Sequence, residues 1–194
     1  MIHPKTELKF ISSEVGYGVV ALEFIPAGTI TWALDNLDRE FTPSKMKKMN
    51  PLYQNILETY CYRNKKGNYV LCWDNGRFVN HSFKSNCLST AYDFEIAIRD
   101  IHPGEELTDD YGYLNVSEPF RGIDEGTRRK TVYPDNLLNF HETWDKQLLK
   151  NFPKIIEVDQ PLNTLISSKL WKEINAIVEG KKTMKSIKEN YFAG

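Results

Sequence analysis

The sequence predicts an α+β fold that is mainly β in its first half and helical toward its C-terminus. Short runs rich in aromatic and β-branched residues, such as residues 17–24 and 29–34, alternate with turns that contain Gly or Pro. Residues 134–178 instead place apolar side chains three and four positions apart, which is the spacing of an amphipathic helix. The change follows Val116, so a β-rich segment and then a helical segment are expected.

Length and composition indicate an ordinary globular protein. The chain has 194 residues, 41% of them hydrophobic and 26% charged, which suits one domain or one domain with an appendage. The net charge of −1 provides no basic field for nucleic acid, and no apolar run approaches the roughly 20 residues needed to span a membrane. Residues 1–10 lack the apolar core of a secretory signal.

The cysteines indicate a reducing setting. Cys61, Cys72 and Cys87 are an odd and scattered set, and none belongs to a CxxC pair. We expect three small buried hydrophobic side chains rather than a disulfide framework. The protein is therefore expected inside the cell, in the cytoplasm or the nucleus.

The β-rich part is expected to hold several short strands interrupted by one helical insert. The predicted strands are residues 8–11, 17–24, 29–34, 69–73, 76–79, the second half of 91–98, and 106–109. The insert, residues 42–60, begins at Thr42-Pro43, where Pro suits the first helical turn, and is broken at Pro51. Ile56 and Tyr60 then continue a helical spacing.

The C-terminal part is expected to hold a loop over residues 119–130 and then three helices. The first helix begins near Pro134-Asp135, and the second apolar stripe is ended by Gly180. Thr183 is predicted to cap a final short helix. No internal repeat or low-complexity tract is present.

Two segments carry the strongest functional signal. Residues 77–82 read Arg-Phe-Val-Asn-His-Ser, an apolar run that ends in Asn-His-Ser, and residues 104–112 read Gly-Glu-Glu-Leu-Thr-Asp-Asp-Tyr-Gly. In this order and at this separation they resemble the two signature segments of the SET domain. That resemblance implies a fold of short curved sheets with a pseudoknot-like active site. It also implies methyl transfer from S-adenosylmethionine to the side-chain amine of lysine in a protein, such as a histone.

The resemblance assigns the cofactor to two places in the chain. Gly16, Tyr17 and Gly18 match the glycine motif whose backbone approaches the methionine end of S-adenosylmethionine, where a side chain would block the approach. Asn80 and His81 match the pair that holds the amino end and the adenine. His81 alone could suggest a metal ligand, but no second His or Cys falls at ligand spacing, so no metal is expected. A packed structural histidine is the alternative.

Tyr111 matches the catalytic tyrosine of the family, and two neighbours match the substrate channel. Methyl transfer needs a neutral amine, alignment, and oxygen atoms around the electron-poor methyl, which a hydroxyl and carbonyls supply. Tyr113 falls where members often have an aromatic wall of the lysine channel. Asp109 stands where an aromatic or β-branched residue is usual, which affects the channel shape. A solvated turn is the simpler expectation for Asp109-Asp110.

Other positions also depart from the family pattern. Phe83 replaces the Cys that commonly follows Asn-His-Ser, and no cysteine follows Cys87, so a cysteine-rich zinc module is absent from this sequence. The helices after residue 134 are then the candidates to close the site. Phe120, Tyr133 and Trp144 are candidates to cover the adenine, unless they form the core of the helical part.

We therefore expect a SET domain over residues 1–116, with the insert at about 42–60, and a helical extension over residues 117–194 that closes the cofactor or substrate site. The expected activity is that of a protein-lysine N-methyltransferase, and the expected partner is a protein or peptide that bears a lysine. The alternative is a catalytically inactive SET fold that binds a peptide or partner. A nucleic-acid role is third, because the basic clusters at residues 45–48, 128–130 and 181–188 are expected to be solvated surface.

Overall fold

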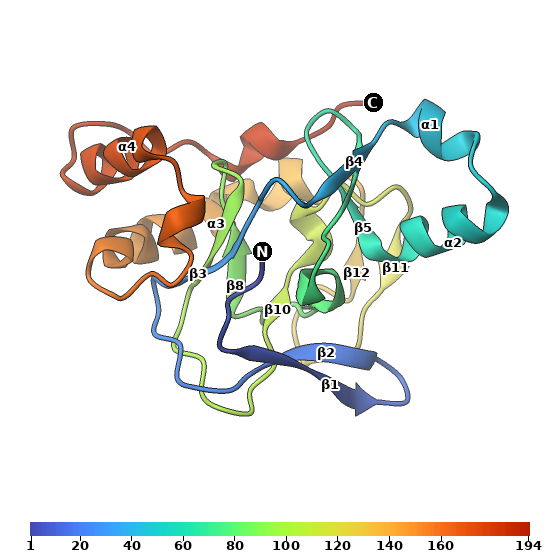
Figure 1. Ribbon diagram of the computed structural model, residues 1–194, viewed down its shortest axis with the longest axis horizontal. Helices are drawn as coiled ribbons and strands as arrows, with labels where there is room; N and C mark the ends of the chain where they lie inside the picture. Colours follow the sequence, from blue (N-terminus) through green and yellow to red (C-terminus); the bar gives the residue numbers. More distant parts are fainter.

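A computed structural model describes all residues from Met1 to Gly194. Five small sheets, each of two or three strands, form the centre of the molecule. Helices α3 (Asn136–Asn151) and α4 (Ser168–Val178) lie on one side of it, and the short helices α1 (Pro43–Lys47) and α2 (Pro51–Tyr60) project from the other (Figure 1). None of the helices combines the length and apolarity that crossing a membrane requires.

The strands pair mostly in antiparallel fashion. The sheets are β1–β2, β4–β6–β5, β3–β9–β8, β10–β7 and β11–β12. The strands are β1 Thr6–Ser12, β2 Gly16–Ala21, β3 Ile30–Ala33, β4 Arg39–Phe41, β5 Cys61–Arg63, β6 Tyr69–Leu71, β7 Asn80–His81, β8 Cys87–Ser89, β9 Phe94–Ala97, β10 Thr108–Asp109, β11 Phe120–Arg121 and β12 Thr131–Val132. The 3₁₀ helices are η1 Asn75–Phe78, η2 Tyr111–Tyr113, η3 Phe152–Ile156, η4 Asn163–Leu165 and η5 Ile187–Asn190.

The parallel pair β7–β10 brings the two signature segments together. Asn80 lies opposite Thr108 and His81 lies opposite Asp109. The backbone N–H of Ser82 continues the pairing by donating to the carbonyl oxygen of Asp109 at 2.9 Å. Because a parallel pair needs a long connection, this contact depends on the folding of β8, β9 and the turn between them.

The predicted helices of the insert are present and are capped as their sequence indicates. The hydroxyl oxygen of Thr42 accepts from the N–H of Lys45, and the Asn50 side chain accepts from Leu52, with Pro at the first helical turn in both cases. A small cluster of Phe41, Met46 and Leu57 packs α1 and α2 onto the sheet β4–β6–β5.

The C-terminal helices share a hydrophobic core with the strands. The larger core cluster has 16 buried residues, and it includes Leu88 and Ile96 from the sheet together with Leu137, Trp144 and Leu148 from α3. A second cluster of 11 residues lies between β2, β3 and the turn that precedes β10. The helical part is therefore packed on the β-rich part along its length.

Two local predictions were wrong. The expected strand at residues 76–79 is the 3₁₀ helix η1, because the Asp74 carboxylate accepts from the N–H of Gly76 at 2.9 Å and starts a helical turn. The last short helix is capped by Ser186 rather than Thr183, since Asp145 of α3 accepts from both the Ser186 hydroxyl and the Ile187 N–H. In both cases a side-chain oxygen sets the first turn.

Candidate active site

Tyr111 is fixed at the point where the two signature segments meet. Its backbone N–H donates to His81 Nδ1 at 3.1 Å, and its hydroxyl donates to the carbonyl oxygen of Val79 at 2.6 Å. Asp110 begins the 3₁₀ turn η2 by accepting from Gly112. Burial raises the pKa of Tyr111, and the nearby Asp109 and Glu95 add to this, so its hydroxyl stays protonated at neutral pH.

His81 lies in an aromatic cluster with Phe83, Tyr111 and Phe120. Its ring centroid is 4.4 Å from that of Phe83 and 5.4 Å from those of Tyr111 and Phe120. Burial lowers the pKa of His81, which keeps the ring neutral and lets Nδ1 accept a hydrogen bond. Its buried Nε2 has no partner, and no group of three or more His, Cys, Asp and Glu side chains is arranged to hold a metal.

Asn80 reaches the glycine motif on β2. Its amide nitrogen donates to the carbonyl oxygen of Tyr17 at 2.9 Å and to Glu106 Oε1 at 2.7 Å. A Cβ at Gly18 would lie only 2.2 Å from Glu106 Oε1 and 2.9 Å from Asn80 Nδ2, so this position accepts only glycine without a shift. Gly16 has a φ of +83° at the turn into β2. The structure thus brings Tyr17, Gly18 and Asn80 together, and adds Glu106.

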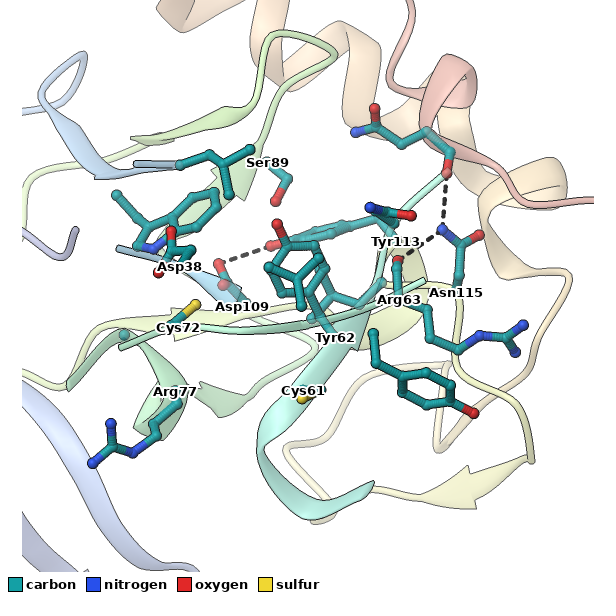
Figure 2. A pocket seen from close by; sticks show the side chains of 18 of the residues that line it. Asp38, Cys61, Tyr62, Arg63, Cys72, Arg77, Ser89, Asp109, Tyr113 and Asn115 are labelled. Atoms are coloured by element: carbon teal, nitrogen blue, oxygen red, sulfur yellow. Dashed lines mark hydrogen bonds between the residues drawn. The ribbon is translucent and has the colours of Figure 1, made fainter. Parts of the chain in front are cut away.

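A pocket of about 670 Å³ lies where the two signature segments meet, and Figure 2 shows side chains that line it. Strands β5 and β6, helix η1 and the segment from Tyr111 to Glu118 line it. Asp109 and Tyr113, the predicted channel residues, both face this pocket, and the Tyr113 hydroxyl donates to Asp109 Oδ1 at 2.9 Å (Figure 2). Tyr113 is almost fully buried, and its pKa is raised by burial.

The expectation of a solvated Asp109-Asp110 turn is wrong. Only 4% of Asp109 and 3% of Asp110 is exposed. Asp109 lies beside Glu95, a buried carboxyl on β9 that was not predicted from the sequence as part of the site. The signal that could have found it is a glutamate in the middle of the apolar run 94–98, because such a position is buried from both faces.

Asp110 is neutralised by Arg129, a second residue missed from the sequence. The guanidinium forms an ion pair with Asp110 and donates to Asn136 Oδ1 at 2.7 Å. It also lies over the rings of Phe140 and Trp144, at 4.7 Å and 5.6 Å from their centroids. Arg129 therefore connects the loop after β11, the turn η2 and helix α3.

The three aromatic candidates for an adenine cover have different surroundings. Phe120 contacts the rings of both His81 and Tyr111, at 5.4 Å and 6.0 Å. Tyr133 is 49% exposed, and Trp144 is buried edge-on against Tyr113. Of the three, only Phe120 lies against the Asn80–His81 strand.

The model of the SET domain family matches residues 16–112, which include both signature segments and the glycine motif. The chain belongs to the SET domain family. This family generally consists of lysine methyltransferases that use S-adenosylmethionine. Its fold accounts for the small sheets accompanied by a few helices.

A crystal structure of a Plasmodium falciparum protein assigned as a histone methyltransferase is similar to 57% of this chain, over 95% of its own length. The two share 21% sequence identity, and the TM-score is 0.42. No curated protein sequence matches this SET protein.

Proposed function

We propose that this SET protein transfers a methyl group from S-adenosylmethionine to the side-chain amine of a lysine in a protein substrate. The observation that carries the proposal is the position of Tyr111. Both its N–H and its hydroxyl are bound to the Val79–His81 segment, and it lines the pocket of about 670 Å³. A protonated hydroxyl held at the end of a pocket can orient an amine and a methyl group.

Residues Gly16–Gly18 and the Asn80–His81 strand fit the cofactor. Gly18 is buried, and its missing Cβ leaves room for the Glu106 carboxylate and the Asn80 amide beside the glycine motif, where these two groups can recognise an ammonium and a carboxylate group. When bound, S-adenosylmethionine supplies a methyl group made electrophilic by its sulfonium sulfur. The chain has only to hold the cofactor and to align the amine, without a metal.

The remaining assignments extend the same proposal. Tyr113 and Asp109 form part of the lysine channel. Strands β4 and β5 are the outer strands of the sheet β4–β6–β5, and their edges can pair with an extended peptide. The crossing of the two signature segments is the pseudoknot-like element of the fold. Residues 1–116 form the SET domain and residues 117–194 close the cofactor side, where Phe120 lies on His81.

The test is transfer of labelled methyl from S-adenosylmethionine to mixed histones and to a cell extract, with Tyr111→Phe as the comparison. The proposal expects the wild type to label a protein band, which reveals the substrate. It expects the rate of labelling by Tyr111→Phe to be lower on the order of 100-fold. No label from the wild type, together with no cofactor binding in calorimetry, would refute it.

One observation favours a second function. Tyr113 and Asp109 bind one another inside the pocket and fill part of the expected channel. If this contact excludes a lysine, the protein is an inactive SET fold that binds a peptide through the outer part of the same groove. Tight peptide binding with cofactor binding but no transfer on any acceptor would favour that function.

A further inference from the structure

Two buried carboxyl groups form a pair in the pocket next to Tyr111. Glu95 comes from β9 and Asp109 from β10, with exposed fractions of 8% and 4%. They are close enough for the charge of Glu95 to raise the pKa of Asp109. Both line the pocket that Tyr111 also lines, so the pair faces the place where a substrate side chain would end.

Each carboxyl of the pair has one neutral donor and no cation. The Ser89 hydroxyl donates to Glu95 Oε1 at 2.7 Å, and the Tyr113 hydroxyl donates to Asp109 Oδ1 at 2.9 Å. No Lys, Arg or His forms a salt bridge with either carboxyl. An uncompensated buried carboxyl is costly, so the site favours either a bound proton or a bound cation.

The surrounding groups leave this need unmet. Arg129 is engaged by Asp110, and the N-terminal amine of Met1 lies 2.9 Å from Asp35. The titratable groups that face the pair are Tyr62, Cys72, Cys87, Asp110, Tyr111, Tyr113 and the N-terminal amine. Burial raises the pKa of Asp109 well above its usual range, with the neighbouring Glu95 adding to it, and burial also raises the pKa of Glu95.

A second feature of the pocket wall also points to a ligand. The indole N–H of Trp32, a side chain that is only 7% exposed, has no hydrogen-bond partner. Trp32 lines the same pocket as the carboxyl pair, and acidic side chains outnumber basic ones among the residues around it. A peptide with a cationic side chain would satisfy both needs, since its cation can bind the carboxyl pair and its backbone carbonyl can accept from the indole N–H.

We propose that the Asp109–Glu95 pair binds the alkylammonium group of the substrate lysine and accepts the proton that this group must lose before methyl transfer. The inference rests on the proposed function and deepens it, since it names the part of the site that selects and deprotonates the substrate. Asp109 stands two residues before Tyr111 in the chain, and both side chains line the same pocket.

The proton transfer is balanced within the pocket. An N–H bond of the ammonium breaks, its electron pair stays on nitrogen, and the proton forms an O–H bond on a pair that held one shared proton. The ammonium and the singly charged pair thereby become a neutral amine and two neutral acids, which a low-dielectric pocket favours over two buried charges. With S-adenosylmethionine bound, the neutral amine would accept the methyl group that the cofactor supplies, and the pair would return its proton to solvent as the methylated ammonium leaves.

The kinetic test compares Asp109→Asn and Glu95→Gln with wild type across pH, and Glu142→Gln, an exposed carboxylate on α3, is the control. The pair variants are expected to lose kcat/KM by about 10-fold or more near neutral pH. The loss should shrink as pH rises toward about 10.4, where a free lysine amine deprotonates without help. A loss that is equal at every pH would show a merely structural role and overturn the proposal.

A binding test works without any methyl transfer. Amide NMR signals of Ser89, Glu95, Asp109 and Tyr113 are followed during titration with n-butylammonium chloride, n-butanol or n-butylguanidinium chloride. The proposal expects n-butylammonium to shift these signals in the wild type, n-butanol to have no such effect, and Asp109→Asn to abolish the response.

The two tests separate the inference from the function on which it rests. Equal responses to n-butylammonium and n-butanol, or a stronger response to the guanidinium, would overturn the inference even if the enzyme methylates lysine. A selective response to n-butylammonium without transfer to any acceptor would instead sustain the binding half of the inference and refute the enzymatic function.

Discussion

The hydroxyl of Tyr111 donates a hydrogen bond of 2.6 Å to the carbonyl oxygen of Val79. The side chain is therefore held by the residue that immediately precedes β7, the strand that pairs with β10. Because this bond fixes the ring before any ligand arrives, the hydroxyl loses little further freedom when a substrate is bound.

Replacement of Tyr111 by Phe removes this bond while keeping the ring. We expect the free energy of unfolding to fall by only about 1 kcal/mol, because one buried hydrogen bond is lost without a change in packing. Urea denaturation measures this cost, and methyl transfer is measured on the same preparation. A fully folded variant with wild-type transfer would contradict the role proposed for the hydroxyl.

Replacement of Asn80 by Ala should weaken the binding of S-adenosylmethionine. The variant loses an amide that donates to both Tyr17 and Glu106, and it leaves the Glu106 carboxylate without this partner. We expect a loss of about 1–3 kcal/mol in binding free energy by isothermal titration calorimetry. Asn139→Ala, which removes an exposed amide of α3 that is bound only to Asp135, should bind the cofactor as the wild type does.

Replacement of Arg129 by Ala should destabilise the protein strongly. The change leaves the buried carboxylate of Asp110 without its counterion and removes the guanidinium that lies over the rings of Phe140 and Trp144. The expected cost is roughly 3–5 kcal/mol in chemical denaturation. Lys130→Ala is the control, since its partner Asp124 is exposed and the unfolding midpoint should hardly move. Similar midpoints for the two variants would argue against the anchoring role of Arg129.

His3 should make the protein less stable as the pH falls. Burial, with Lys5 adding to it, lowers the pKa of His3 from 6.5 to about 4. The unfolded chain therefore takes up the proton first, so stability that is full above pH 6.5 is lost as the pH falls through about 4. The total effect is roughly 3 kcal/mol, because each tenfold change in proton affinity is worth about 1.36 kcal/mol.

The measurement for His3 is the urea midpoint of the wild type and of His3→Gln at several pH values across that window. Carboxyl groups also titrate there, so the difference between the two proteins isolates the histidine. Parallel curves for the two proteins would show that His3 does not contribute to the acid sensitivity.

Local patterns predicted much of the secondary structure. The helices of the insert follow from Thr42-Pro43 and Asn50-Pro51, and helix α3 begins at Asn136, next to the predicted start at Pro134-Asp135. Strands β4, β5 and β8, and the hairpin β11–β12, were not predicted. Each has only two or three residues, so its strand conformation depends on a partner strand rather than on its own side chains.

The residue types of the proposed site were determined by the sequence itself. Asn80, His81 and Tyr111 stand in an order and context that indicate one family, because methyl transfer requires few chemical groups but fixed ones. Only the tertiary structure decided which neighbours surround them. Glu95 becomes a partner of Asp109, and Arg129 neutralises Asp110, through contacts between segments whose separation in the chain carries no local signal. Burial, which sets the protonation of these carboxyls, is a property of the whole fold.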